Sequence, residues 1–123
     1  MDARELMIGD WVRYIISKIA VQVESVIEDG INYELSQGDF DFIKEDRIKP
    51  IPLTEEILKV NGFSKNFSEM YTKWIVPFEV NIRGNNKYIT LDGKYLCNSD
   101  YVHELQHALR LCGLNYLADN LKI

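Results

Sequence analysis

Apolar and polar residues alternate along the first fifty positions of the chain, as they do in short strands that bury one face. Val12 and Tyr14, for example, flank the polar Arg13. The pattern predicts about five strands, at 12–16, 19–24, 31–35, 40–42 and 47–49. Residues 28–30 and 36–38 are of the types that reverse a chain, so we expect consecutive strands to be joined by tight turns.

Several short strands in about fifty residues are best accommodated in a small closed barrel, because closure removes exposed strand edges. The opening Ile8-Gly9-Asp10-Trp11-Val12 resembles the start of SH3-like barrels, so we expect a closed antiparallel barrel over 8–49. The alternation predicts the following inward side chains: Val12, Tyr14, Val21, Val23, Tyr33 and Phe42.

The pattern changes after Pro50-Ile51-Pro52, because prolines remove hydrogen-bond donors from a strand. Thr54 suits the N-cap of a short helix at 55–60, and Asn61-Gly62 suits its C-terminal end. Residues 63–77 match no single pattern, and we leave their structure unassigned.

Alternation returns between Phe78 and Leu96, where Asp92-Gly93 is a strong hairpin signal, so we expect a three-stranded meander. The clearest helix covers 101–112; Asn98, Ser99 or Asp100 can cap it, and Gly113 ends it.

These elements predict an α+β fold. An SH3-like β-barrel over 1–52 is followed, over 53–123, by a short helix, a β-meander and a C-terminal amphipathic helix, and we expect both parts to form one compact unit.

The charge balance favours a protein partner over a nucleic acid. The 123 residues include 19 acidic and 14 basic side chains, a net charge of −5. Residues 1–62 carry thirteen acids and seven bases, so the predicted barrel is the acidic part and repels phosphate. No apolar run is long enough for a membrane span or a signal peptide, which predicts a cytoplasmic protein with no membrane partner.

One motif has a chemical meaning: His103-Glu104-Leu105-Gln106-His107. On a helix, histidines four positions apart share a face and can bind zinc, with the glutamate as general base for a metal-bound water. This hypothesis makes His103 and His107 metal ligands, Glu104 the catalytic residue and zinc the cofactor. The chain would then be a small zinc-dependent hydrolase.

The surroundings of the motif favour a different interpretation. Zinc hydrolases need a third protein ligand, and the sixteen residues after His107 contain neither histidine nor glutamate, so that ligand would have to come from an upstream loop. At about 100° per residue, both histidines fall opposite the apolar stripe, on a face shared with Gln106 and Arg110. We therefore expect two surface histidines, no metal and no catalytic residue.

Two other groups of residues allow a chemical and a structural interpretation. The acids Asp39, Asp41, Glu45 and Asp46 could suggest calcium, but the spacing of a calcium-binding loop is missing and Asp39 to Phe42 alternates as a solvated strand. Cys112 could be a nucleophile beside His107, but it falls in the apolar stripe, so we expect a buried structural thiol. Neither cysteine has metal-finger spacing, and both are expected to be free.

Two blocks of sequence resemble a known group of proteins. Residues 50–58 with Gly62-Phe63, and the closing 101–109, are similar to blocks in small uncharacterised proteins of gut Bacteroidetes and of the phages and mobile elements of that phylum. The resemblance implies a phage-related setting and transfers no functional residue.

The prediction for function is therefore a non-enzymatic binding or assembly protein that contacts a protein partner through loops or edge strands, and the zinc hydrolase is the alternative. The sequence names neither the partner nor the oligomeric state.

Overall fold

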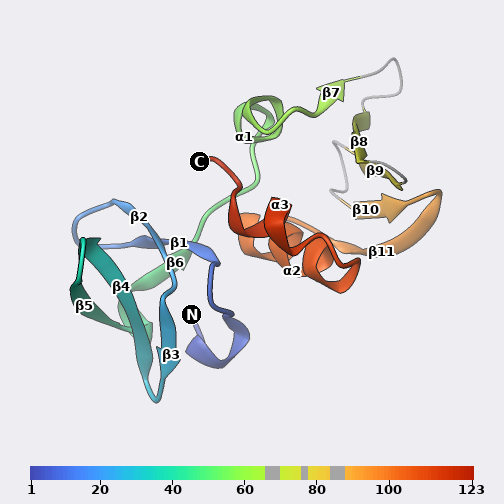
Figure 1. Ribbon diagram of the computed structural model, residues 1–123. Helices are drawn as coiled ribbons and strands as arrows, with labels where there is room; N and C mark the ends of the chain where they lie inside the picture. Colours follow the sequence, from blue (N-terminus) through green and yellow to red (C-terminus); the bar gives the residue numbers. More distant parts are fainter. Residues whose placement is uncertain (66–69, 76–77, 84–87) are drawn as a thin grey trace. The chain divides into compact units, whose positions relative to one another are not determined.

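The computed structural model of the chain describes residues 1–65, 70–75, 78–83 and 88–123 (Figure 1). The chain divides into two units, Met1–Ile51 (unit 1) and Pro52–Ile123 (unit 2). Unit 1 is built of strands and unit 2 combines strands with helices, so the α+β class is confirmed.

Unit 1 contains six strands and two short 3-10 helices. In chain order they are η1 (Ala3–Glu5), β1 (Trp11–Tyr14), β2 (Ala20–Gln22), β3 (Ser25–Ile27), β4 (Gly30–Ser36), β5 (Asp39–Lys44), η2 (Glu45–Arg47) and β6 (Ile48–Pro50). The strands form two antiparallel three-stranded sheets, with the orders β2-β1-β6 and β3-β4-β5. Within unit 1, all of which is described, the strands do not pair into one closed ring, so the closed barrel is not confirmed.

The strand predicted at 19–24 corresponds to β2, which pairs with β1. The strand that follows it, β3, was not predicted and pairs with β4. The chain bends at Glu24 between them, and the Glu24 amide donates to the Asn32 carbonyl at 2.8 Å. The segment 20–27 therefore contains two strands, each with its own neighbour.

The core of unit 1 contains most of the side chains that alternation predicts. It consists of Leu6, Val12, Val21, Val23, Ile31, Tyr33, Ile43 and Ile48, with Tyr14 packed against it and partly buried. Phe42 was expected inward, and that prediction is wrong: its side chain is 40% exposed, and the adjacent Ile43 is buried instead. Because strand side chains alternate, placing Ile43 in the core directs Phe42 to the other face.

On that face Phe42 covers Gly30. A Cβ atom at Gly30 would overlap the Ile43 carbonyl oxygen and the Phe42 ring. The left-handed residue of the preceding turn is Asp29, with φ 70°, so Gly30 is a strand residue. The glycine is required for close packing, not for the turn.

Unit 2 begins with α1 (Glu55–Val60), where Thr54 accepts from the Ile57 amide and Gly62 has a φ of 89°. The predicted helix at 55–60 is confirmed with its cap. A five-stranded antiparallel sheet of order β11-β10-β9-β8-β7 follows. Its strands are β7 (Ser64–Lys65), β8 (Met70–Ile75), β9 (Phe78–Arg83), β10 (Tyr88–Leu91) and β11 (Lys94–Asn98). The predicted meander is β9 to β11, and the segment left unassigned contributes β7 and β8; 66–69 and 76–77 lie outside the described residues.

The hairpin signal at Asp92-Gly93 is confirmed. Leu91 pairs with Lys94, and both turn residues have positive φ, 50° and 83°, as the two-residue turn with matching twist requires. The sheet is followed by α2 (Val102–Leu111) and by α3 (Asn115–Asp119), which the sequence analysis did not predict. Gly113, with φ 77°, ends α2 as expected, whereas the N-cap is Tyr101 and not Asn98, Ser99 or Asp100.

We expect Gly30→Ala to destabilise unit 1 by about 3 kcal/mol, because the new methyl group overlaps a backbone oxygen that cannot rotate away. Chemical denaturation measures the loss. Gly38→Ala is the matched control: it has open space around it and a φ of 82°, so it should cost only about 1 kcal/mol of backbone strain. Equal losses for the two variants would contradict the close packing at Gly30.

Candidate functional site

The motif helix α2 is buried on more sides than its hydrophobic pattern predicts. His103 is 7% exposed and Gln106 is fully buried, so the expectation of a solvated face is wrong for both; His107 is half-buried. For Gln106 the physical reason is α3. The Gln106 side chain donates to the Ala118 carbonyl at 2.9 Å, and Arg110 pairs with Asp119 at 3.1 Å, so α3 covers this side of α2.

Glu104 holds the start of the helix. One of its carboxylate oxygens, Oε1, accepts from the Asp100 amide at 3.1 Å and from the Tyr101 amide at 3.0 Å. These are amides at the helix N-terminus, where a negative charge is also favoured by the helix dipole. The carboxylate that the zinc hypothesis needs as a general base therefore has a structural function in this fold.

The two histidine rings meet edge to face, with centroids 5.6 Å apart, and Tyr101 stacks on His103 at 6.0 Å. Within the described part of the chain, no three His, Cys, Asp or Glu side chains are grouped so that they could hold a metal ion. The structure thus brings His103 and His107 together, as their spacing requires, and places no third ligand beside them among those residues.

The acidic residues of the calcium alternative have separate environments. Asp39 accepts from the Ser36 hydroxyl at 3.0 Å, and Glu45 accepts from the Ala3 amide at 3.0 Å. Asp41 and Asp46 are exposed. Asp39 and Asp41 are exposed, as expected, but they lie on the same face of β5 as Ile43, which is the reverse of the predicted orientation.

Cys112 is half-buried at the C-terminal end of α2. Burial raises the pKa of the Cys112 thiol above its ordinary value. The pKa of Cys97 is raised as well, first by burial and then by the charge of Glu104. A raised pKa keeps a thiol protonated and weakens it as a nucleophile, which favours the structural interpretation.

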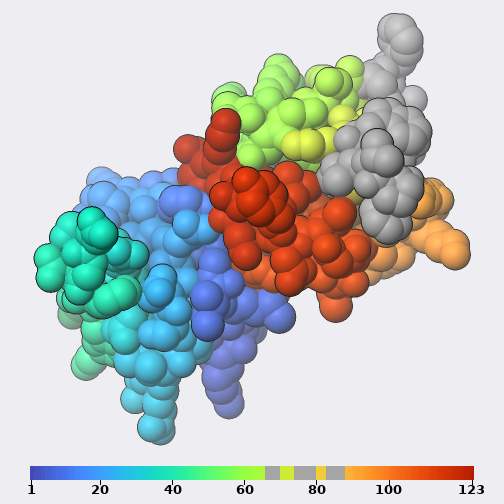
Figure 2. Space-filling view, viewed as in Figure 1, coloured from blue at the N-terminus to red at the C-terminus, as the bar shows by residue number. Residues whose placement is uncertain are grey.

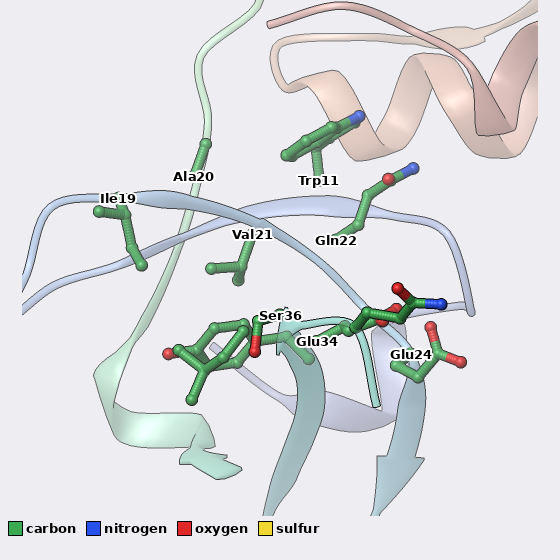
Figure 3. Close-up of a pocket in the computed structure, with 11 residues that line it drawn as sticks. Trp11, Ile19, Ala20, Val21, Gln22, Glu24, Glu34 and Ser36 are labelled. Atoms are coloured by element: carbon green, nitrogen blue, oxygen red, sulfur yellow. The ribbon is translucent and has the colours of Figure 1, made fainter. Parts of the chain in front are cut away.

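Unit 1 contains a groove that the sequence analysis did not locate. It has a volume of about 540 Å³ and lies between β2 and the C-terminal half of β4 (Figure 3). Val21 and Tyr33, both 5% exposed, form part of its lining, and Val21 points towards Ser36 and Glu34 in Figure 3. Burial and the nearby Asp41 charge raise the pKa of Tyr33, so its hydroxyl stays protonated.

Exposed side chains form the rest of the groove. Ile19 is 43% exposed and Leu35 is 58% exposed, and Glu24 and Glu34 are exposed as well. The segment 34–42, teal in Figure 2, is exposed at every residue. Alternation places Ile19 on the same face as Val21 and Leu35 on the same face as Tyr33, so the pattern alone does not indicate that Ile19 and Leu35 are exposed.

Comparison with protein-family models, with curated proteins and with solved structures gave no match. The resemblance to small proteins of gut Bacteroidetes and their phages therefore stays a prediction. No helix in the described ranges has the length and apolar character needed to cross a membrane.

The two functions considered for Glu104 predict different mutational results. We expect Glu104→Gln to cost about 0.3–1 kcal/mol, because the amide oxygen still accepts while the charge at the dipole is lost. Glu104→Ala removes both hydrogen bonds and should cost about 1–2 kcal/mol more. Glu56→Ala, in the first turn of α1, is the control for charge alone. A general base would show the reverse: hydrolysis lost in Glu104→Gln at unchanged stability.

Replacing the histidines one at a time separates burial from metal binding. We expect His103→Ala to cost about 2 kcal/mol or more, since it removes a buried ring, and His107→Ala to cost less than about 1 kcal/mol. Denaturation of metal-free protein measures both. A metal site would give a different result. Zinc would then stabilise the unsubstituted chain, and the His→Ala variants would be less stable than that chain only when zinc is present.

Proposed function

We propose that the chain is a non-enzymatic binding or assembly protein and that the groove of unit 1 is where it contacts a protein partner. The single observation that carries this proposal is the groove itself, which combines buried apolar residues with exposed apolar ones at Ile19 and Leu35. Burial of such side chains against a partner favours association, because it releases water from apolar surface.

The strand order of unit 1 supports an SH3-like fold. The last strand, β6, pairs with β1, and the bent segment formed by β2 and β3 belongs to both sheets. We infer that unit 1 is an SH3-like barrel that is open along the line where β2 and β4 diverge. Folds of this kind serve many functions, so the argument for binding rests on the groove and not on the fold.

Charge favours a protein over a nucleic acid as the partner. Of the eleven residues that line the groove, Glu24 and Glu34 are acidic and none is basic. Carboxylates at this position repel a phosphate backbone. The predicted phage-related setting is compatible with an accessory protein of this type.

Site-specific photo-crosslinking tests the proposal. A benzophenone side chain placed at Ile19 or at Leu35, in cells that contain the natural partner, should give one and the same protein adduct. The control position is Leu111 on α2, which is 86% exposed but lies outside the groove. Adducts at Leu111 equal to those at Leu35, or none at either groove position, would contradict the proposal.

A further inference from the structure

One edge of β2 pairs with β1, and its other edge faces away from β1. The backbone amide of Tyr14 donates to the Ile19 carbonyl at 2.9 Å, and the backbone amide of Val23 donates to the Asp10 carbonyl at 2.8 Å. Residues in an antiparallel strand bond alternately to either side. Ile19, Val21 and Val23 therefore bond towards β1, and the amide and carbonyl of Ala20 point the other way, to the outer edge of the sheet.

The opposite wall of the groove is also a strand edge. β3 pairs with β4 only over Gly30–Asn32, whereas β5 pairs with it as far as Ser36. The Asn32 carbonyl accepts from Glu24, on the side away from β5. By the same alternation, the backbone of Glu34 points to that side, which is the groove. Two strand edges thus border one apolar depression.

We propose that the partner enters this groove as an extended strand, pairing with the edges of β2 and β4, and that this strand carries basic side chains. This inference rests on the proposed function and adds the chemistry of the partner. Strand addition of this kind takes its affinity from main-chain hydrogen bonds and its specificity from alternate side chains. Here the apolar side chains of the strand face Val21 and Tyr33, and its lysines or arginines reach Glu24 and Glu34.

The charge preference follows from the groove and not only from the whole chain. Glu24 lies at the bend between β2 and β3 and Glu34 lies on β4, so the two carboxylates belong to opposite walls. The carboxylates of Glu24 and Glu34 would repel an acidic strand from both walls. A basic strand could form an ion pair with each of them. Complementary charge selects the partner and speeds the encounter.

A synthetic peptide tests the inference directly. The probe is acetyl-KVKVKVK-amide, titrated into the ¹⁵N-labelled full chain and followed by amide chemical shifts. We expect shifts confined to β2 and to residues 33–37. Two control peptides should not bind: acetyl-EVEVEVE-amide, in which the charge is reversed, and acetyl-KPKPKPK-amide, in which the charge is kept but proline prevents strand pairing.

Two sets of variants separate charge from backbone pairing. Glu24→Lys with Glu34→Lys should raise the peptide Kd at least about tenfold, ~1.4 kcal/mol. The control with the same net charge, Glu28→Lys with Asp46→Lys, changes exposed acids outside the groove and should leave the Kd unchanged. Ala20→Pro removes an amide at the outer edge of β2, which β1 does not use, and should weaken binding without loss of the fold.

Several outcomes would overturn the inference: no binding of the lysine–valine peptide, equal binding of the proline peptide, shifts outside the groove, or no effect of the Glu24 and Glu34 reversal. If the peptide fails while Ile19 and Leu35 still crosslink to one protein, only the chemistry proposed for the partner is wrong. If the crosslinks are absent as well, the proposed function is wrong too.

Discussion

Unit 1 depends on how one bent segment of chain distributes its hydrogen bonds. Residues 20–27 pair with β1 through one edge and, beyond the bend at Glu24, with β4 through the other. This arrangement lets a single short segment take part in both sheets, and it places Val21 and Val23 in the core. It also forces β2 and the end of β4 to diverge, because a chain that bends cannot follow both neighbours. The groove is the space that this divergence leaves.

In unit 2 the corresponding constraint is that buried polar groups must form hydrogen bonds. Gln106 is fully buried and is tolerated because its side chain donates to the Ala118 carbonyl. Asn61 is buried at the end of α1, where its side chain exchanges two hydrogen bonds with the backbone of Lys122. Both amides attach the C-terminal segment to earlier parts of the chain. The motif at 103–107, whose spacing is typical of a zinc site, also has a structural function in unit 2. Glu104 caps α2, and His103 lies buried against Tyr101.

Much of the fold was accessible from local pattern. Thr54 and Gly62 define α1, and Asp92-Gly93 defines a hairpin, because caps and two-residue turns depend on a few neighbouring residues. Phe42 was misplaced because both Phe42 and Ile43 are apolar, and alternation cannot decide which of two adjacent apolar residues faces the core. Residues 63–77 had no clear period, and β7 and β8 acquire a reason to form only in the sheet, where β7 pairs with β8 and β8 pairs with β9.

Local sequence pattern was enough to predict the α+β class, the Asp92-Gly93 turn, both ends of α1 and the C-terminal end of α2, the acidity of the N-terminal part and the approach of His103 to His107. The tertiary structure decided which faces of those elements are covered. The face of α2 with Gln106 is polar by composition and became buried because α3, too short to be recognised by its own pattern, packs on it. The groove likewise had no local signature: its two walls, β2 and β4, come together only when the chain folds back beyond the bend at Glu24, and such long-range geometry is not encoded in the spacing of neighbouring residues.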